Sequence, residues 1–197
     1  MGLEIWKFIS AIGLVFTGFF LNQKWQQTKE RRQQLLNVIS LLSAVEQELC
    51  FYTGKLNVLV AFLDKHSTPN LHGNVTGIVV PSYNFHPAFL EKSKGMLIDY
   101  HETAELVVVV GECQFELSHI QYKLEHYRVT CKDLWGRAES EELMPSVSGN
   151  RVSLRNLAEA NAKSFSENRS MVIAKLDQMK ALLTEHRERD FFGSFLE

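Results

Sequence analysis

The sequence predicts an all-α protein, with a single amino-terminal transmembrane helix followed by an elongated, antiparallel three-helix bundle of the coiled-coil type. The first 21 residues carry only two charged side chains. The rest of the chain places apolar residues at alternating spacings of three and four, which is typical of packed helices. All four prolines fall in two short zones or at a helix start, so long tracts contain no proline to break a helix.

The membrane anchor is predicted at residues 1–21, with the span over residues 5–21. The span has 17 residues and one charge, Lys7, at the end where its side chain can reach the headgroups. Trp6 and Trp25 flank it, about 28 Å apart on a helix. This matches the two edges of an apolar core about 30 Å thick, where tryptophan is favoured. The expected anchor residues are Trp6, Phe8, Ile12, Phe16, Phe20 and Trp25.

Two other interpretations of the apolar run are a cleaved signal peptide and a buried core helix. A signal peptide needs small residues at a cleavage site after the run, and residues 21–25 (LNQKW) supply none. A core helix of a soluble protein normally keeps a polar stripe, whereas residues 8–21 have no charge on any side. The sequence therefore favours a membrane anchor.

A basic juxtamembrane collar at residues 22–34 sets the expected orientation. It contains four basic residues, opposed only by Glu30, and these are expected to face lipid headgroups: Lys24, Lys29, Arg31 and Arg32. Basic residues beside a span remain cytoplasmic. We therefore expect a single-pass protein of the cell (inner) membrane of a bacterium, with its amino terminus outside and its body in the cytoplasm.

Composition limits the classes of partner for the body. The whole chain has a formal net charge of −2, and residues 1–34 hold five basic and two acidic side chains, so the remainder is close to −5. Such a body lacks the basic surface that nucleic-acid binding requires. The three cysteines have no metal-type spacing. Two of them, Cys113 and Cys131, fall on an apolar row, which indicates buried, reduced thiols.

The helical bundle is predicted at residues 35–190, with helices at about 22–66, 100–139 and 151–189 and an irregular loop at 67–87. Each helix has an apolar row at spacings of three and four. The first row comprises Leu35, Val38, Leu42, Val45, Leu49, Tyr52, Leu56, Leu59 and Leu63. The second comprises Leu106, Val110, Cys113, Leu117, Ile120, Leu124, Tyr127, Cys131 and Leu134. The third comprises Leu154, Leu157, Phe165, Val172, Leu176, Met179 and Leu183, interrupted by Asn161 and Asn168.

Local signals predict how these elements begin and end. A short strand is conceivable at residues 78–80 and a short helix at 88–94, ended by Gly95. Asp99 and Glu102 resemble a capping box at the start of the second long helix. The segment 140–149 contains Pro145 and is interpreted as a polar turn, with Asn150 capping the last helix. Helices joined in this way predict an up-down-up order.

The carboxyl-terminal segment, residues 191–197, is predicted to be an apolar tail beyond the last helix. Four large apolar residues stand among its seven: Phe191, Phe192, Phe195 and Leu196. They would either fold back on the bundle or bind a groove in a partner protein.

The candidate chemistry is sparse. Glu116 and His119 form one Glu-x-x-His pair, but a di-iron bundle needs this pair twice together with further carboxylates, and no other histidine follows an acid at this spacing. Glu105, Glu112, His119 and His126 recur every seven residues and are interpreted as a solvated helix face. The sequence contains no nucleophile-elbow or phosphate-loop motif. We therefore predict no catalytic, metal or cofactor-binding site.

The function expected from these features is a role without catalysis. A membrane-anchored helical bundle would assemble itself or a partner protein at the cytoplasmic face, as a scaffold or adaptor. Two alternatives are a membrane-perturbing effector or regulatory subunit of a bacterial stress or phage-defence system, and a ligand-sensing bundle. The expected partners are membrane lipid and protein, in a homo-oligomer or with another chain, and not nucleic acid.

Overall fold

The structure is a computed structural model that describes residues 2–65, 84–85, 88–135 and 144–193. Nearly all of these residues are helical, and no strand occurs among them. The elements are α1 (Gly2–Lys65), α2 (Ala88–Ile98), the 3-10 helix η1 (His101–Thr103), α3 (Ala104–Trp135) and α4 (Met144–Gly193). The all-α prediction is confirmed. The short strand considered at residues 78–80 lies outside the described residues.

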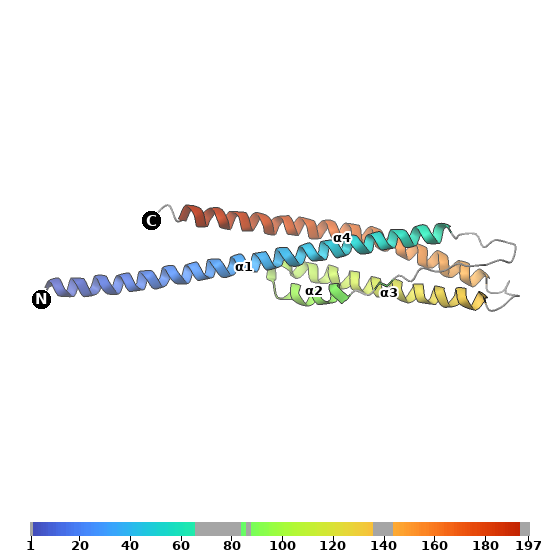
Figure 1. The fold of residues 1–197 in the computed structure, drawn as a ribbon, viewed down its shortest axis with the longest axis horizontal. Helices are drawn as coiled ribbons and strands as arrows, with labels where there is room; N and C mark the ends of the chain where they lie inside the picture. Colours follow the sequence, from blue (N-terminus) through green and yellow to red (C-terminus); the bar gives the residue numbers. More distant parts are fainter. Residues whose placement is uncertain (1, 66–83, 86–87, 136–143, 194–197) are drawn as a thin grey trace. The chain divides into compact units, whose positions relative to one another are not determined.

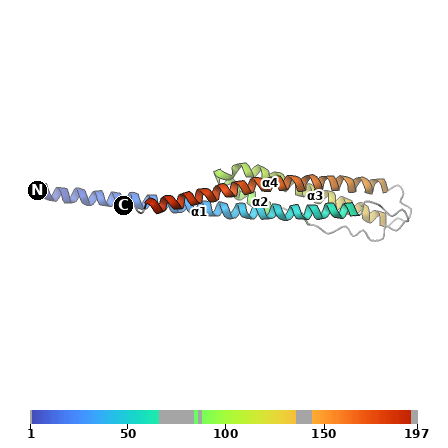
Figure 2. The same cartoon turned by 90° about the horizontal axis from the view of Figure 1, so that it is seen from above.

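Helix α1 is continuous over 64 residues, and its ribbon has no break in either view (Figures 1 and 2). The predicted anchor and the first predicted bundle helix are therefore parts of one helix. No proline occurs between Gly2 and Lys65, so every peptide in this tract can donate to the helical ladder. Gly54 lies inside the helix, and a Cβ added there would meet no atom within 4 Å.

The chain divides into two compact units, residues 1–40 with 177–197, and residues 41–176. In the first unit Leu35, Val38 and Met179 are buried. In the second unit all the predicted row residues of α1 from Leu42 onward are buried, and so are those of α3 from Leu106 to Cys131. The spacing of three and four therefore identified the core correctly on both helices, because it places one side chain per turn on the same face.

Helix α2 packs along α3 (Figure 1) and is longer than predicted. It continues through Gly95 to Ile98, and a glycine inside a helix costs only about 1 kcal/mol relative to alanine. The expected capping box does not form, since η1 begins after Tyr100 without a side-chain hydrogen bond. The buried hydroxyl of Thr103 instead donates to the carbonyl oxygens of Leu97 at 2.9 Å and Tyr100 at 3.0 Å, which fixes the bend between α2 and α3.

Helix α4 begins at Met144, seven residues earlier than predicted. Pro145 was interpreted as part of a turn, but it lies in the first turn of the helix, where its missing N–H has no intrahelical role. Asn150 consequently does not cap the helix. Its side-chain nitrogen lies 3.3 Å from His126 Nδ1 and 3.4 Å from Thr130 Oγ1, so the residue links α4 to α3.

Candidate membrane anchor and interaction surfaces

The part of the predicted anchor whose side chains the structure describes, residues 15–21, exposes large apolar groups. Helix α1 is long and apolar enough to cross a membrane, a property that the core helix of a soluble protein can share. The apolar side chains that the structure describes near its amino-terminal end are exposed. Phe16, Phe19 and Phe20 are 60–64% exposed, and Val15 and Leu21 are also exposed. Three exposed phenylalanines within five residues are costly in water and favourable in lipid.

Three of the six predicted anchor residues can be placed with their side chains. Phe16 and Trp25 are exposed on α1. The backbones of Trp6, Phe8 and Ile12 belong to α1, but their side chains lie outside the described set. Phe20, with an exposure of 62%, completes the predicted group.

The basic collar follows directly on the same helix. Lys24, Lys29, Arg31 and Arg32 are all exposed. Lys29 Nζ lies 5.4 Å from the centroid of the Trp25 ring, within the range of a cation–π contact. An aromatic ring with a cation at its face suits the boundary between hydrocarbon and headgroups, where the ring is half immersed and the ammonium stays hydrated.

The predicted tail is in part helical. Phe191 and Phe192 belong to α4, which continues to Gly193, whereas Phe195 and Leu196 lie outside the described residues. The side chains of Phe191 and Phe192 are also outside the described set. The role predicted for these four residues therefore stays a prediction.

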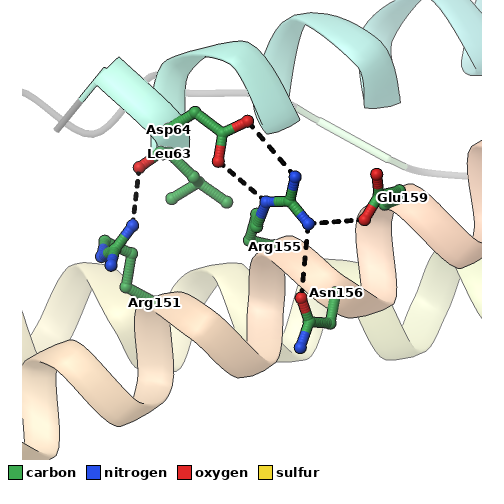
Figure 3. A network of polar contacts seen from close by, with 6 residues as sticks. All are labelled: Leu63, Asp64, Arg151, Arg155, Asn156 and Glu159. Carbon is green, nitrogen blue, oxygen red and sulfur yellow. Dashed lines mark hydrogen bonds and ion pairs between the residues drawn. The ribbon is translucent and has the colours of Figure 1, made fainter. Parts of the chain in front are cut away.

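At the end of α1 a polar network connects it to α4 (Figure 3). Arg155 Nε donates to Asp64 Oδ1 at 2.8 Å, and Arg155 also pairs with Glu159 within α4. The hydrogen bond from Arg155 lowers the pKa of Asp64. Arg151 Nη1 donates to the carbonyl oxygen of Leu63 at 3.0 Å. This satisfies a carbonyl of the last helical turn, which has no partner inside the helix.

Two further ion pairs join α4 to the other long helices. Arg169 pairs with Glu46 of α1 at 2.6 Å, and Lys175 pairs with Glu105 of α3 at 2.9 Å. Partly exposed pairs contribute about 0–1 kcal/mol each. Their contribution to the stability of the fold is therefore small. Their main effect is to specify which faces of the helices pack together.

The two asparagines that interrupt the row of α4 both bond to α3. Asn161 is buried and donates to Glu116 Oε2 at 3.1 Å. The amide nitrogen of Asn168 lies 3.2 Å from Cys113 Sγ. Sequence reasoning treated these residues as weak points because it considered α4 alone, whereas their hydrogen-bond partners are on another helix. Burial raises the pKa of the Cys113 thiol to about 11, which makes this cysteine a poor nucleophile at neutral pH.

Glu48 is a partly buried carboxyl on α1. One of its oxygens, Oε2, is buried without a hydrogen-bond partner among the described residues. Desolvation raises the pKa of Glu48 to about 7, against an opposing hydrogen bond from Tyr52. Desolvation and the neighbouring Glu48 raise the pKa of Tyr52 to about 12. The raised pKa of Glu48 could not be predicted from the sequence, because it arises from burial against other helices.

Glu116 and His119, which form the Glu-x-x-His pair, each contact another side chain. Glu116 accepts the hydrogen bond from Asn161, and His119 lies 6.5 Å from Phe115 between ring centroids. Within the described residues, no three histidine, cysteine or acidic side chains come together in a way that could hold a metal ion. Along the predicted solvated face, Glu105, Glu112 and His126 are exposed and His119 is half-buried.

An exposed apolar row on α3, hereafter the outer row, was not noticed in the sequence. It consists of Val108, Phe115, Tyr122 and Val129, with exposures of 63%, 68%, 67% and 51%. Beside it lies an open groove of about 410 Å³, lined by Lys94 of α2 and by Val107, Val108, Gly111, Glu112, Phe115 and Glu116 of α3. Lys94 crosses Gly111 so closely that a Cβ at position 111 would lie 3.1 Å from its Nζ.

Comparison with known proteins yields no relative: no protein-family model, no curated sequence and no solved structure matches the chain.

Proposed function

We propose that this protein is a single-pass membrane protein whose helical body assembles copies of itself, or a partner protein, at the cytoplasmic face of the membrane. The observation that carries the proposal is the order of surfaces on α1. Exposed Phe16, Phe19 and Phe20 come first, and the exposed basic collar at residues 22–34 follows. A lipid-embedded segment that ends at anionic headgroups has this order.

The orientation follows from the same collar. Four basic side chains stand on the carboxyl-terminal side of the apolar run, against Lys7 and the amino terminus on the other side. Because segments rich in lysine and arginine remain in the cytoplasm, we place the amino terminus outside and residues 35–190 inside. The collar would gain about 1 kcal/mol per basic residue from anionic lipid.

We further propose that residues 41–176 form a three-helix bundle in which α4 runs antiparallel to both α1 and α3. The polar contacts support this arrangement. Late α1 contacts early α4 at Asp64–Arg155, and earlier α1 contacts later α4 at Glu46–Arg169. On α3 the order is also reversed, with Glu116 bonded to Asn161 and Glu105 paired with Lys175.

This arrangement differs from the up-down-up order, in which α1 and α4 would run in the same direction. Between Lys65 and Ala88 there are 22 residues, which can span up to about 70 Å. The chain is therefore long enough to return along the bundle before α3 begins, so α3 can run parallel to α1. Asn84 and Phe85 support such a return, because the carbonyl oxygen of Asn84 accepts from Lys55 at 3.2 Å and the amide of Phe85 donates to Gln121 at 2.9 Å.

A role in assembly, without a reaction, agrees with the chemistry of the body. Two of its thiols, Cys113 and Cys131, are buried and their pKa values are raised, so neither is activated for nucleophilic attack. The surface instead offers the outer row and its groove, which are features of contact surfaces.

Two measurements test the membrane proposal. After alkaline carbonate extraction the full chain should stay with the membrane pellet. Cys50 is exposed, whereas Cys113 and Cys131 are buried, so Cys50 is the natural reporter of topology. A membrane-impermeant maleimide should label Cys50 only after the cells are opened, and a Cys50→Ser variant is the matched control. Release by carbonate, or labelling of Cys50 in intact cells, would refute the proposal.

A further inference from the structure

The unit formed by residues 1–40 and 177–197 contains parts of two helices that run in opposite directions. Helix α1 leaves this unit at Ser40 and α4 enters it at Asp177, so these two residues mark the same end of the unit. The buried apolar side chains that the structure describes in the unit lie near that end: Leu35, Val38 and Met179. Since the described residues of the unit belong to α1 and α4, this burial indicates that the two helices pack on each other there.

Helix geometry places the end of α4 level with the proposed boundary of the membrane. Each residue of a helix advances about 1.5 Å along its axis. Phe191 follows Asp177 by 14 residues, or about 21 Å. Trp25 precedes Ser40 by 15 residues, or about 22 Å. Phe191 and Phe192 therefore belong to the level of Trp25, where the proposed span meets the headgroups.

Helix α1 is not covered at this level. None of the side chains at positions 15–34 of α1 is buried, and Trp25 is 62% exposed. Burial on α1 begins only at Leu35, ten residues farther along the helix. In the proposed topology the material beside α1 at the level of Trp25 is therefore lipid, and the end of α4 stands at the same level.

The sequence at the end of α4 repeats, in reverse, the order found on α1. On α1 the exposed phenylalanines at 16, 19 and 20 come before the basic collar. On α4 two arginines, at 187 and 189, come before Phe191 and Phe192. Because the helices run in opposite directions, both carry their aromatic residues on the side of the span. Residues 185–190 also contain three acidic side chains, so attraction to anionic headgroups does not favour this segment, and its aromatic residues are what suit it to lipid.

We propose that the end of α4 is a second membrane contact, in which Phe191 and Phe192 enter the headgroup region of the leaflet that holds Trp25. This contact rests on the membrane anchor proposed above and adds a lipid-binding site to it. An apolar segment that lies in the interface reaches about 5–10 Å into it, and phenylalanine gains free energy by leaving water. Two contacts, one on each helix, restrict rotation of this unit about the span, which a single span leaves free.

Quenching by brominated lipid tests the contact on the full-length protein in liposomes of phosphatidylcholine. In a Cys50→Ser background the remaining thiols, Cys113 and Cys131, are buried, so one added cysteine carries a fluorescent label. The label is placed at Gly193→Cys, at the end of α4, or at Lys163→Cys, an exposed site on the same helix. We expect lipid brominated on its acyl chains to quench the label at 193 at least about twofold more than the label at 163. Equal quenching at the two sites would overturn the proposal.

A double variant tests which residues make the contact. Phe191→Gln with Phe192→Gln should reduce the quenching of the label at the end of α4 to the level of the label at 163. Glutamine is a good helix former, so these changes do not shorten α4, and circular dichroism checks this. The matched control is Met171→Gln with Ile173→Gln, at two exposed apolar residues of α4, and it should leave the quenching unchanged. Equal loss in the two double variants, or no loss in the first, contradicts the assignment.

A third label separates failure of this contact from failure of the proposed function. Gly18→Cys places it in the predicted span, at a glycine of α1 where a Cβ would meet no atom within 4 Å. Quenching at 18 without quenching at 193 leaves the anchor in place and overturns the second contact. Quenching at 193 without quenching at 18 supports the lipid contact of α4 and refutes the anchor. If neither label is quenched, both proposals are wrong.

Discussion

Replacing Glu48 with glutamine should stabilise the folded protein above about pH 7 and change its stability little below about pH 4.5. Partial burial raises the pKa of Glu48 from 4.5 to about 7, and Oε2 is buried without a partner among the described residues. The folded protein thus keeps a proton that the unfolded chain releases in this range. The destabilising contribution is absent below the unfolded pKa, grows as pH rises, and is complete above the folded pKa.

The expected size of the effect follows from the shift. A rise of about 2.5 pKa units corresponds to about 3.4 kcal/mol at 1.36 kcal/mol per unit. That value is an upper limit, because Glu48 is only partly buried and water reaches the rest of its side chain. We discount it for solvent screening to about 1–2 kcal/mol. Glutamine has nearly the same shape and no charge at any pH, so it removes this contribution without opening a cavity.

The assay is urea unfolding of the full chain in detergent, followed by far-ultraviolet circular dichroism at about pH 4 and about pH 8. The free energy of unfolding of Glu48→Gln minus that of the wild type should be near zero at the lower pH and about 1–2 kcal/mol at the higher pH. Glu91→Gln, at an exposed carboxyl of α2, is the control and should change the free energy of unfolding by less than about 0.5 kcal/mol at both pH values. An identical difference at the two pH values would refute the reasoning.

Three further predictions concern the core, the thiols and the helix contacts. Leu56→Ala should lower the free energy of unfolding by about 2–5 kcal/mol because Leu56 is fully buried. The control Val58→Ala, at an exposed site, should change the free energy of unfolding by less than about 0.5 kcal/mol. Urea titration measures both values. Burial raises the pKa of the Cys113 thiol from 9.0 to about 11. At pH 8 this thiol should therefore react with Ellman's reagent about a hundredfold more slowly than an unperturbed thiol. Unfolding in urea should abolish this protection. A double-mutant cycle of Asn161→Ala and Glu116→Ala should give a coupling energy of about 1–2 kcal/mol, and a coupling near zero would show that their hydrogen bond contributes nothing.

The sequence was sufficient to predict the helices and most of the core, because both follow from one periodicity. Apolar residues at spacings of three and four specify a helix and at the same time name the side that it buries. Helix ends were predicted less well. Pro145 and Gly95 were interpreted as breaks, but proline is compatible with the first turn of a helix and glycine costs an interior position only about 1 kcal/mol. Neighbouring helices readily offset a cost of this size.

What sequence reasoning missed depends on contacts between helices. Asn161 and Asn168 looked like defects in an apolar row until Glu116 and Cys113 on α3 were seen to bond them. A polar group at such a position restricts the pairing of helices, because any shift along the axis leaves it buried without a partner. The raised pKa of Glu48 likewise arises from its surroundings. None of these contacts follows from the periodicity of a single helix.

The two apolar rows of α3 differ in how densely their residues are spaced and in how deeply they are buried. The inner row places a residue at every third or fourth position and is almost fully buried, whereas the outer row has one residue in seven and stays exposed. Since stabilisation scales roughly with the apolar area buried, the denser row can hold a permanent core and the sparser row only a reversible contact. Under the proposed assembly role, such a contact would suffice where copies are already concentrated. The exposed phenylalanines at 16, 19 and 20 and the basic collar after them would concentrate the copies at a membrane. Removing the anchor should therefore weaken assembly in cells without altering the outer row itself.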